Sequence, residues 1–149
     1  MKAAALLLAA VAAPLAACGG DEVPTAAELY GTWTNVTDGT ARALVFSETS
    51  SERAELAGLS PTYLLYNYPV GTTPTYVQAG TYAIEERPLN VAGETITDDA
   101  LVVMVRWDAS GTQAGMAFGN AIDSYDGDSL GLTLSDGTVR LYQSATALP

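Results

Sequence analysis

Apolar and polar residues alternate along most of the chain, and this period of two predicts β-strands. The segment Ala41–Ser47 places Leu44 and Phe46 on one face, and Ala100–Trp107, apolar on both faces, is the strongest candidate strand. The other predicted strands are Leu29–Val36, Thr62–Tyr68, Thr75–Glu85, a weak Pro88–Val91, Gln113–Phe118, Ala121–Tyr125, Ser129–Leu134 and Thr138–Ser144.

Turn signals separate these strands at short intervals. Ser135-Asp136-Gly137 contains an Asp-Gly pair that favours a hairpin, and Tyr125–Ser129 predicts another tight turn. No helical period extends beyond two turns; Ser50–Leu59 is predicted to be a loop, with one or two helical turns as the alternative. Eight to ten short strands joined by hairpins predict an all-β fold. We expect an antiparallel up-and-down β-barrel of about eight strands, because closure removes exposed strand edges.

The N-terminus differs from the rest of the chain. Met1-Lys2 precedes the almost wholly apolar segment Ala3–Leu15, an arrangement typical of a secretory signal. About 16 apolar residues are fewer than the ~20 that a membrane-spanning helix needs. The segment ends in Leu15-Ala16-Ala17-Cys18.

This ending resembles the bacterial lipobox, a motif that places a branched residue and two small residues before a cysteine. The resemblance implies that residues 1–17 are a lipoprotein signal peptide, that cleavage leaves Cys18 first, and that its sulfur carries a diacylglyceryl group. Two acyl chains hold a protein on a membrane where one chain does not. A plain secretory signal followed by an unrelated Cys18 is the alternative.

The lipobox implies that the membrane is a partner through Cys18 and that the protein lies in the bacterial cell envelope. Gly19-Gly20 follow the cysteine, without the adjacent Asp that favours inner-membrane retention, so the outer membrane is favoured where the organism has one. Residues 18–27 are predicted to be the lipidated cysteine with a short tether, and residues 28–149 the folded domain.

Composition excludes several kinds of function. The chain has 6 Lys and Arg, 17 Asp and Glu, and a net charge of −11. Without Lys2, five Arg against 17 acidic residues give −12 for the mature chain. Such a charge repels phosphate backbones and argues against nucleic-acid binding. The chain has no His and a single Cys, so we expect no internal disulfide, no metal site and no cofactor.

Several short motifs in the predicted domain occur in an order seen in one known family. Gly31-Thr32-Trp33 lies on the first strand, Gly80-Thr81-Tyr82 lies at mid-chain, and Gly137 to Tyr142 closes the chain around Arg140. With the lipobox, this order resembles the small bacterial lipocalin-like lipoproteins, over about residues 28–145. The family's pattern implies structural roles for Gly31, Trp33 and Arg140: the Trp plugs the barrel base, and the Arg stacks across its indole ring.

The chain departs from that family in three ways. The domain is short, and it lacks both the usual C-terminal helix and the common disulfide. The family resemblance implies non-catalytic binding of a small apolar or amphipathic ligand inside the barrel. The residues predicted to line the ligand are Trp33, Tyr63, Leu65, Tyr76, Tyr82, Val103 and Val105.

An interaction module is the alternative function. In that case the barrel would be solid, and its loops would contact an envelope protein or inhibit a protease. An enzyme is not expected, because the chain has no His to activate a serine, no Lys after Lys2 and no Gly-x-Ser-x-Gly motif. The two functions differ in one observable property: a ligand carrier needs an apolar cavity of a few hundred Å³.

Overall fold

Eight strands of alternating direction form the wall of a barrel. The structure is a computed structural model that describes residues 22–69 and 71–149. The predicted signal peptide and Cys18 lie outside the described residues. The strands are β1 (Gly31–Asn35), β2 (Arg42–Ser47), β3 (Thr62–Asn67), β4 (Thr75–Val91), β5 (Glu94–Asp108), β6 (Ala117–Tyr125), β7 (Ser129–Thr133) and β8 (Val139–Ala145).

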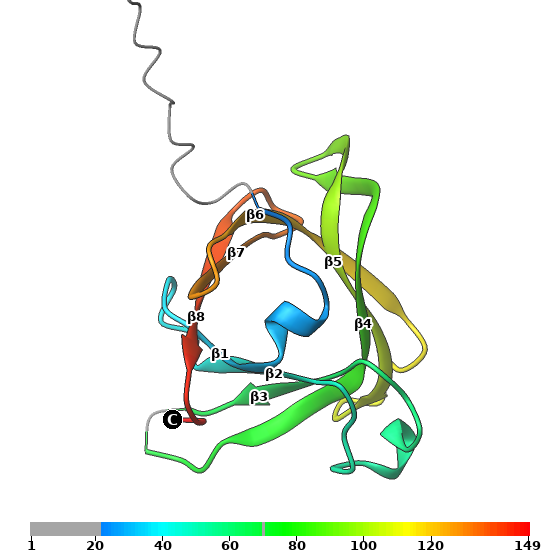
Figure 1. Cartoon of the computed structure of the whole chain (residues 1–149), viewed down its shortest axis with the longest axis vertical. Helices are drawn as coiled ribbons and strands as arrows, with labels where there is room; N and C mark the ends of the chain where they lie inside the picture. Colours follow the sequence, from blue (N-terminus) through cyan, green and yellow to red (C-terminus); the bar gives the residue numbers. More distant parts are fainter. Residues whose placement is uncertain (1–21, 70) are drawn as a thin grey trace, which may run out of the picture.

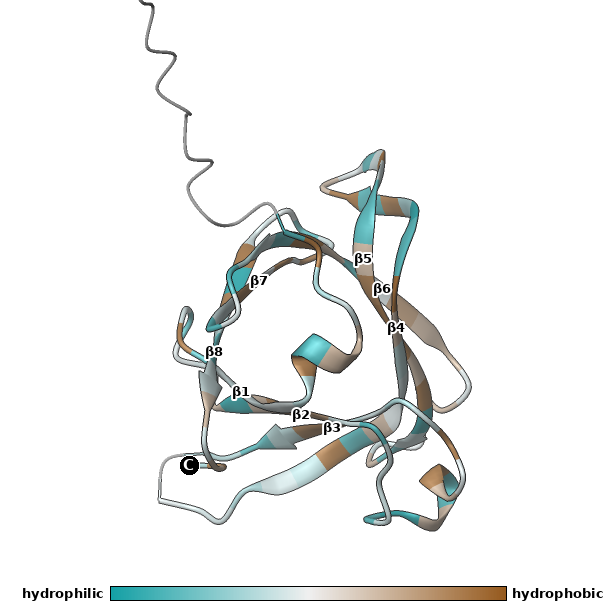
Figure 2. Ribbon diagram, in the orientation of Figure 1, coloured by the Kyte–Doolittle hydropathy of each residue, from teal (hydrophilic) through white to brown (hydrophobic). Residues whose placement is uncertain are grey.

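Each strand pairs antiparallel with the next one along the chain, and β8 pairs with β1 to close the barrel (Figure 1). The predicted all-β, up-and-down barrel of eight strands is therefore confirmed. The architecture is consistent with the lipocalin-like fold that the motifs predict. Apolar and polar positions alternate along the strands in Figure 2, as expected for a wall that faces a core on one side and solvent on the other.

Two strands are longer than predicted. The predicted pair Thr75–Glu85 and Pro88–Val91 is one continuous strand, β4, and β5 begins at Glu94 rather than at Ala100. Together they form a hairpin that extends beyond the barrel (Figure 1). Pro88 is tolerated there because β4 pairs with β3 only as far as Thr81, so the rest of β4 is an edge on that side.

Gln113–Phe118 and Ala121–Tyr125 were predicted as two strands, but only one strand, β6, occupies this region. Residues 113–116 form a turn instead, in which the Met116 amide donates to the Gln113 carbonyl oxygen at 3.0 Å. The Gly119-Asn120 pair between the predicted strands continues β6, opposite Val102 and Leu101.

Two short 3-10 turns complete the fold. The first, η1 (Ala27–Leu29), lies inside the barrel outline when the molecule is viewed down the barrel (Figure 1). The second, η2 (Ala54–Leu56), belongs to the loop predicted between β2 and β3, and it packs Leu56 on the outside of the wall against Leu64 and Ala79. No helix in residues 22–69 and 71–149 is long and apolar enough to cross a membrane.

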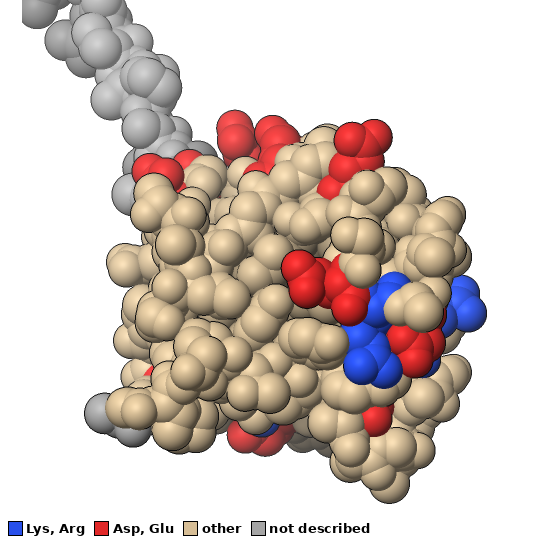
Figure 3. All heavy atoms as spheres, turned by 90° about the horizontal axis from the view of Figure 1, so that it is seen from below, with Lys and Arg blue, Asp and Glu red and all other residues tan. Residues whose placement is uncertain are grey.

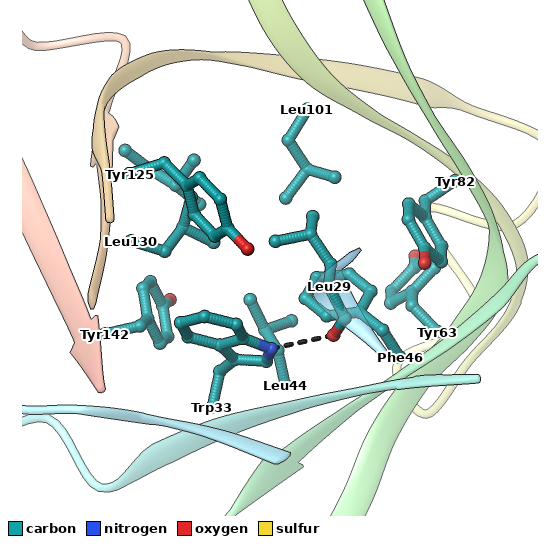
Figure 4. Packing of buried hydrophobic residues seen from close by; sticks show 11 residues of the cluster. Leu29, Trp33, Leu44, Phe46, Tyr63, Tyr82, Leu101, Tyr125, Leu130 and Tyr142 are labelled. Atoms are coloured by element: carbon teal, nitrogen blue, oxygen red, sulfur yellow. Dashed lines mark hydrogen bonds between the residues drawn. The ribbon is translucent and has the colours of Figure 1, made fainter. Parts of the chain in front are cut away.

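The barrel interior is filled at one end. Trp33, Phe46, Tyr82, Tyr125 and Leu130 point inward from five strands around Leu29 of η1 (Figure 4). Leu29 is fully buried, so η1 acts as a plug. We call the layer formed by Leu29 and the five side chains around it the floor of the barrel. A second layer lies next to the floor and consists of Leu44, Tyr63, Leu101, Leu132 and Tyr142.

Candidate functional site

Hydrogen bonds hold the plug against the floor. The Trp33 indole N–H donates to the Leu29 carbonyl oxygen at 2.8 Å (Figure 4). The Tyr82 hydroxyl donates to the Ala26 carbonyl oxygen at 2.5 Å, so two floor residues satisfy backbone oxygens of η1 and of the residue before it. Buried backbone oxygens need such partners. The barrel is therefore closed at this end.

The opposite end of the barrel contains a cavity of about 450 Å³. Its volume lies within the range of about 300–1,000 Å³ that small-molecule sites occupy. The second layer forms its base, and its apolar lining consists of Leu44, Leu65, Val77, Leu101, Val103, Phe118, Leu132 and Leu134. The strand registers place the loops after β1, β3, β5 and β7 around its opening, which we call the mouth.

One wall of the cavity carries a connected polar network. The Tyr63 hydroxyl donates to the Gln78 side-chain oxygen at 2.9 Å, and the Gln78 amide nitrogen donates to the Gln113 side-chain oxygen at 2.8 Å. Burial raises the pKa of Tyr63 well above its usual range, so this hydroxyl stays protonated and remains a donor. Two hydrogen bonds therefore link these three side chains along one wall of the cavity.

Asp108, the last residue of β5, also lines the cavity. Its carboxylate accepts hydrogen bonds from the Ser110 hydroxyl and, at 3.2 Å each, from the Thr112 and Gln113 amides. The Ser110 bond is the main cause of a pKa below the usual value for Asp108. Hydrogen bonds from its own loop therefore stabilise the ionised carboxylate, although these neutral donors do not cancel its negative charge.

Two arginines reach the cavity from the mouth, and their surroundings differ. Arg140 on β8 donates to one oxygen of Asp38, through its terminal nitrogen at 3.0 Å and its Nε at 3.1 Å. The Thr40 side chain and Asn35 hold the pKa of Asp38 well below its usual range, and Arg140 adds to this effect. The Arg140 charge is thus neutralised by a carboxylate that stays ionised.

Arg42 on β2 has no such partner. Its Nε atom is buried without a hydrogen-bond partner, and no carboxylate in residues 22–69 and 71–149 lies within 4.0 Å of its guanidinium. The side-chain oxygen of Asn67, directly opposite on β3, is also buried without a partner. A buried polar group without a partner is uncommon and costly in a folded protein.

The residues predicted to bind a ligand occupy four different places. Tyr63, Leu65 and Val103 line the cavity. Trp33 and Tyr82 belong to the floor beneath it, and Val105 is fully buried without lining the cavity.

Tyr76 does not face the barrel interior, contrary to the prediction. A β-bulge in β4 shifts the register between Leu65 and Tyr66, so that Tyr76 pairs with the outward-facing Tyr66. On this outer face the Tyr76 ring lies edge-on to Trp107 at 5.5 Å, and the Arg53 guanidinium lies 4.1 Å from the Trp107 ring centre. One extra residue reverses which face a side chain occupies.

The predicted stacking of Arg140 across Trp33 is also wrong. Trp33 lies opposite Ser144 in the register of β1 and β8, four residues from Arg140. At about 3.3 Å per residue, the two positions are separated by roughly 13 Å along the strand. Trp33 lies in the floor at the closed end, with the Tyr125 ring 6.3 Å away, whereas Arg140 lies near the mouth.

Sequence reasoning missed Arg42 as a cavity residue. The signal was present, because Arg42 is two residues from Leu44 and four from Phe46, and therefore shares their inward face. The prediction counted Arg42 only among the five arginines that enter the net charge of the mature chain.

The charges that the structure describes form no candidate metal site: no group of three or more His, Cys, Asp or Glu in residues 22–69 and 71–149 is placed to hold a metal ion. On the face seen in Figure 3, basic atoms gather at one edge beside acidic ones. Arg53 and Glu55 form an ion pair with a separation of 3.1 Å.

The chain was compared with known families and with curated proteins. No family model matches the sequence, and no curated protein is significantly similar to it.

Proposed function

We propose that this protein is a lipid-anchored, non-catalytic binding protein of the bacterial cell envelope, and that it holds a small apolar or amphipathic molecule in its barrel. The observation that carries the proposal is the cavity of about 450 Å³ between the second layer and the mouth. A barrel of eight strands is just wide enough to be filled by side chains or to hold one small ligand. Here η1 fills one end, and the other end stays open.

The arrangement of the lining also supports a binding role. Leu44, Leu101 and Leu132 form an apolar base, and the polar groups are concentrated nearer the mouth. Sites of this kind bind through apolar contact and fix orientation with a few polar groups. A solid barrel acting only through its loops would not need such a cavity.

Native mass spectrometry tests the binding role. The full chain is expressed in bacteria, purified in mild detergent and compared with Val103→Trp, which places an indole in the cavity. Met104→Trp is the matched control, because Met104 is the next residue and is exposed on the outer face. We expect an extractable extra mass in the wild type and in Met104→Trp that is lost in Val103→Trp. A clean apo mass in the wild type after incubation with envelope lipid extract would contradict the proposal.

The anchor is proposed from Leu15-Ala16-Ala17-Cys18 alone. Its test compares the full chain with Cys18→Ser by membrane fractionation and intact mass. We expect the wild type in the membrane fraction with a diacylglyceryl mass on the cleaved chain, and we expect both to be lost in Cys18→Ser. Separation of inner and outer membranes then tests the favoured outer-membrane location.

A further inference from the structure

Among the described residues that line the cavity, Arg42 is the one whose side chain has a buried polar atom without a hydrogen-bond partner. Its Nε is buried and makes no hydrogen bond, although the guanidinium carries a permanent charge. The neighbouring Arg140 has its own carboxylate in Asp38. On the other side of the cavity, the donors around Asp108 and the Tyr63–Gln78–Gln113 network are already paired.

The uncompensated charge lies where a ligand would enter. Arg42 faces inward on β2 and lies two residues nearer the mouth than Leu44, which belongs to the second layer. Burial raises the pKa of the Tyr142 hydroxyl, and the guanidiniums of Arg140 and Arg42 oppose this shift. The positive potential of the two guanidiniums therefore extends to Tyr142, in the second layer of the core.

We propose that Arg42 binds the anionic head of an amphipathic monoanion, a carboxylate or a phosphate, whose apolar tail lies in the cavity. A guanidinium presents its N–H groups in a planar fork that matches these oxygen pairs. One of the two arginines is paired with a carboxylate and the other is not, so together they favour a ligand head with a single negative charge. The inference rests on the proposed binding function and specifies its ligand class.

The proposal also explains why a carrier with a net charge of −11 could take up an anion. Long-range repulsion from a surface is screened over about 8–10 Å at physiological salt. A partly buried guanidinium acts at contact distance and is screened much less. Recognition would therefore depend on Arg42 and not on the overall charge.

The test measures affinity for three probes with the same tail and different heads: laurate, dodecyl phosphate and the uncharged dodecanol. Each is titrated calorimetrically below its micelle concentration into the full chain carrying Cys18→Ser, so that no acyl group competes for the cavity. The variants are Arg42→Gln, Arg42→Lys and Arg106→Gln. Arg106 is an exposed residue with no ion pair among residues 22–69 and 71–149, and its variant makes the same change in net charge.

We expect at least one anion to bind at least tenfold more tightly than dodecanol to the wild type and to Arg106→Gln. Arg42→Gln should lose this preference and keep its affinity for dodecanol, and Arg42→Lys should keep part of the preference. Which anion binds identifies the head group. Thermal unfolding without ligand supplies a second readout: Arg42→Gln should be at least as stable as the wild type, because it removes an uncompensated charge.

Two results separate this inference from the proposed function. Equal affinity for dodecanol and both anions, or an anion preference that survives in Arg42→Gln, would overturn the role of Arg42 and leave a binding barrel. Failure of all three probes to bind would overturn the binding function itself, and the inference with it.

Discussion

The hydroxyl of Thr62 in the barrel wall shows how much stability a single unpaired polar atom can cost the folded protein. Thr62 on β3 is fully buried, and its Oγ1 has no hydrogen-bond partner. A buried donor or acceptor left without a partner costs about 1–3 kcal/mol. Valine has almost the same shape and carries no polar group, and its branched side chain suits a strand.

We therefore expect Thr62→Val to stabilise the protein by about 1 kcal/mol, measured as the free energy of unfolding in urea. Thr81, directly opposite on β4, is the control because it is partly exposed and its hydroxyl reaches water. Thr81→Val should gain less. A loss of stability in Thr62→Val would show that its hydroxyl is satisfied in solution.

At the scale of elements, the prediction succeeded where the alternation is unbroken and failed where the register shifts. β2 and β7 were placed within a residue or two, because Leu44 and Phe46 in β2, like Leu130 and Leu132 in β7, are spaced two residues apart and share one face. Tyr76 was assigned to the wrong face because nothing in a period of two reveals a bulge. Arg140 was assigned to the wrong end because the offset between β1 and β8 is set by tertiary pairing and not by local sequence.

The cavity was harder to predict than the fold. Its lining comes from seven strands, and its volume is what remains after η1 fills one end. The sequence around Ala27–Leu29 has no feature that distinguishes a plug from the end of a tether. Only the three-dimensional packing of Leu29 does so, which is why the predicted ligand list mixed floor residues with cavity residues.

The plug provides a prediction of its own. Leu29 is fully buried among the floor residues, so Leu29→Ala should reduce the free energy of unfolding by about 2–5 kcal/mol. Leu141→Ala is the matched control: Leu141 is 39% exposed on β8, and its loss should cost less than about 0.5 kcal/mol. Urea unfolding measures both. Equal costs would mean that η1 is not docked in the barrel.

The bulged pairing of β4 and β5 depends on one glycine. A Cβ atom on Gly80 would lie 1.9 Å from the Met104 carbonyl oxygen and 2.9 Å from the Tyr63 ring. The backbone oxygen cannot move without breaking the pairing next to the bulge at Ala79 and Gly80. The absence of a side chain therefore allows the two strands to approach here.

We expect Gly80→Ala to destabilise the protein by about 3 kcal/mol or more, since overpacking costs typically 1–3 kcal/mol and more where the backbone must shift. Gly119→Ala is the control. Its new Cβ would meet the Leu89 side-chain tip at 2.9 Å, a group that can rotate away. Chemical unfolding of the two variants should give a much smaller loss for Gly119→Ala, and similar losses would contradict the argument from Gly80.

At the scale of the whole molecule, the ionisable groups fall into two sets with a wide gap between them. The chain has no His, one Cys and one Lys, so few groups titrate between about pH 5 and pH 9. The acidic set includes Asp38, Asp108 and Asp136, whose pKa values are all lowered by hydrogen bonds in the folded state. The second set is the buried tyrosines of the core.

The signs of these shifts predict a stability plateau with two edges. A lowered carboxyl pKa contributes stability above about pH 4, the unfolded value, and the contribution is lost as pH falls through the folded value. Burial raises the pKa of Tyr63 and Tyr82, so their contribution is complete below about pH 10 and is lost as pH rises further. The melting temperature should therefore be nearly constant from about pH 5 to pH 9 and fall on both sides.

The dependence of the melting temperature on pH is measured by thermal unfolding followed by circular dichroism. The buffer contains about 0.15 M salt, which screens the acidic surface. Tyrosinate absorbance should rise together with unfolding at the alkaline edge, because the buried hydroxyls ionise only once the barrel opens. Tyr82→Phe is the informative variant: it removes one raised pKa, so it should weaken the alkaline edge and leave the acid edge unchanged. A steep change near neutral pH would contradict this account, because the described residues contain no group that titrates there.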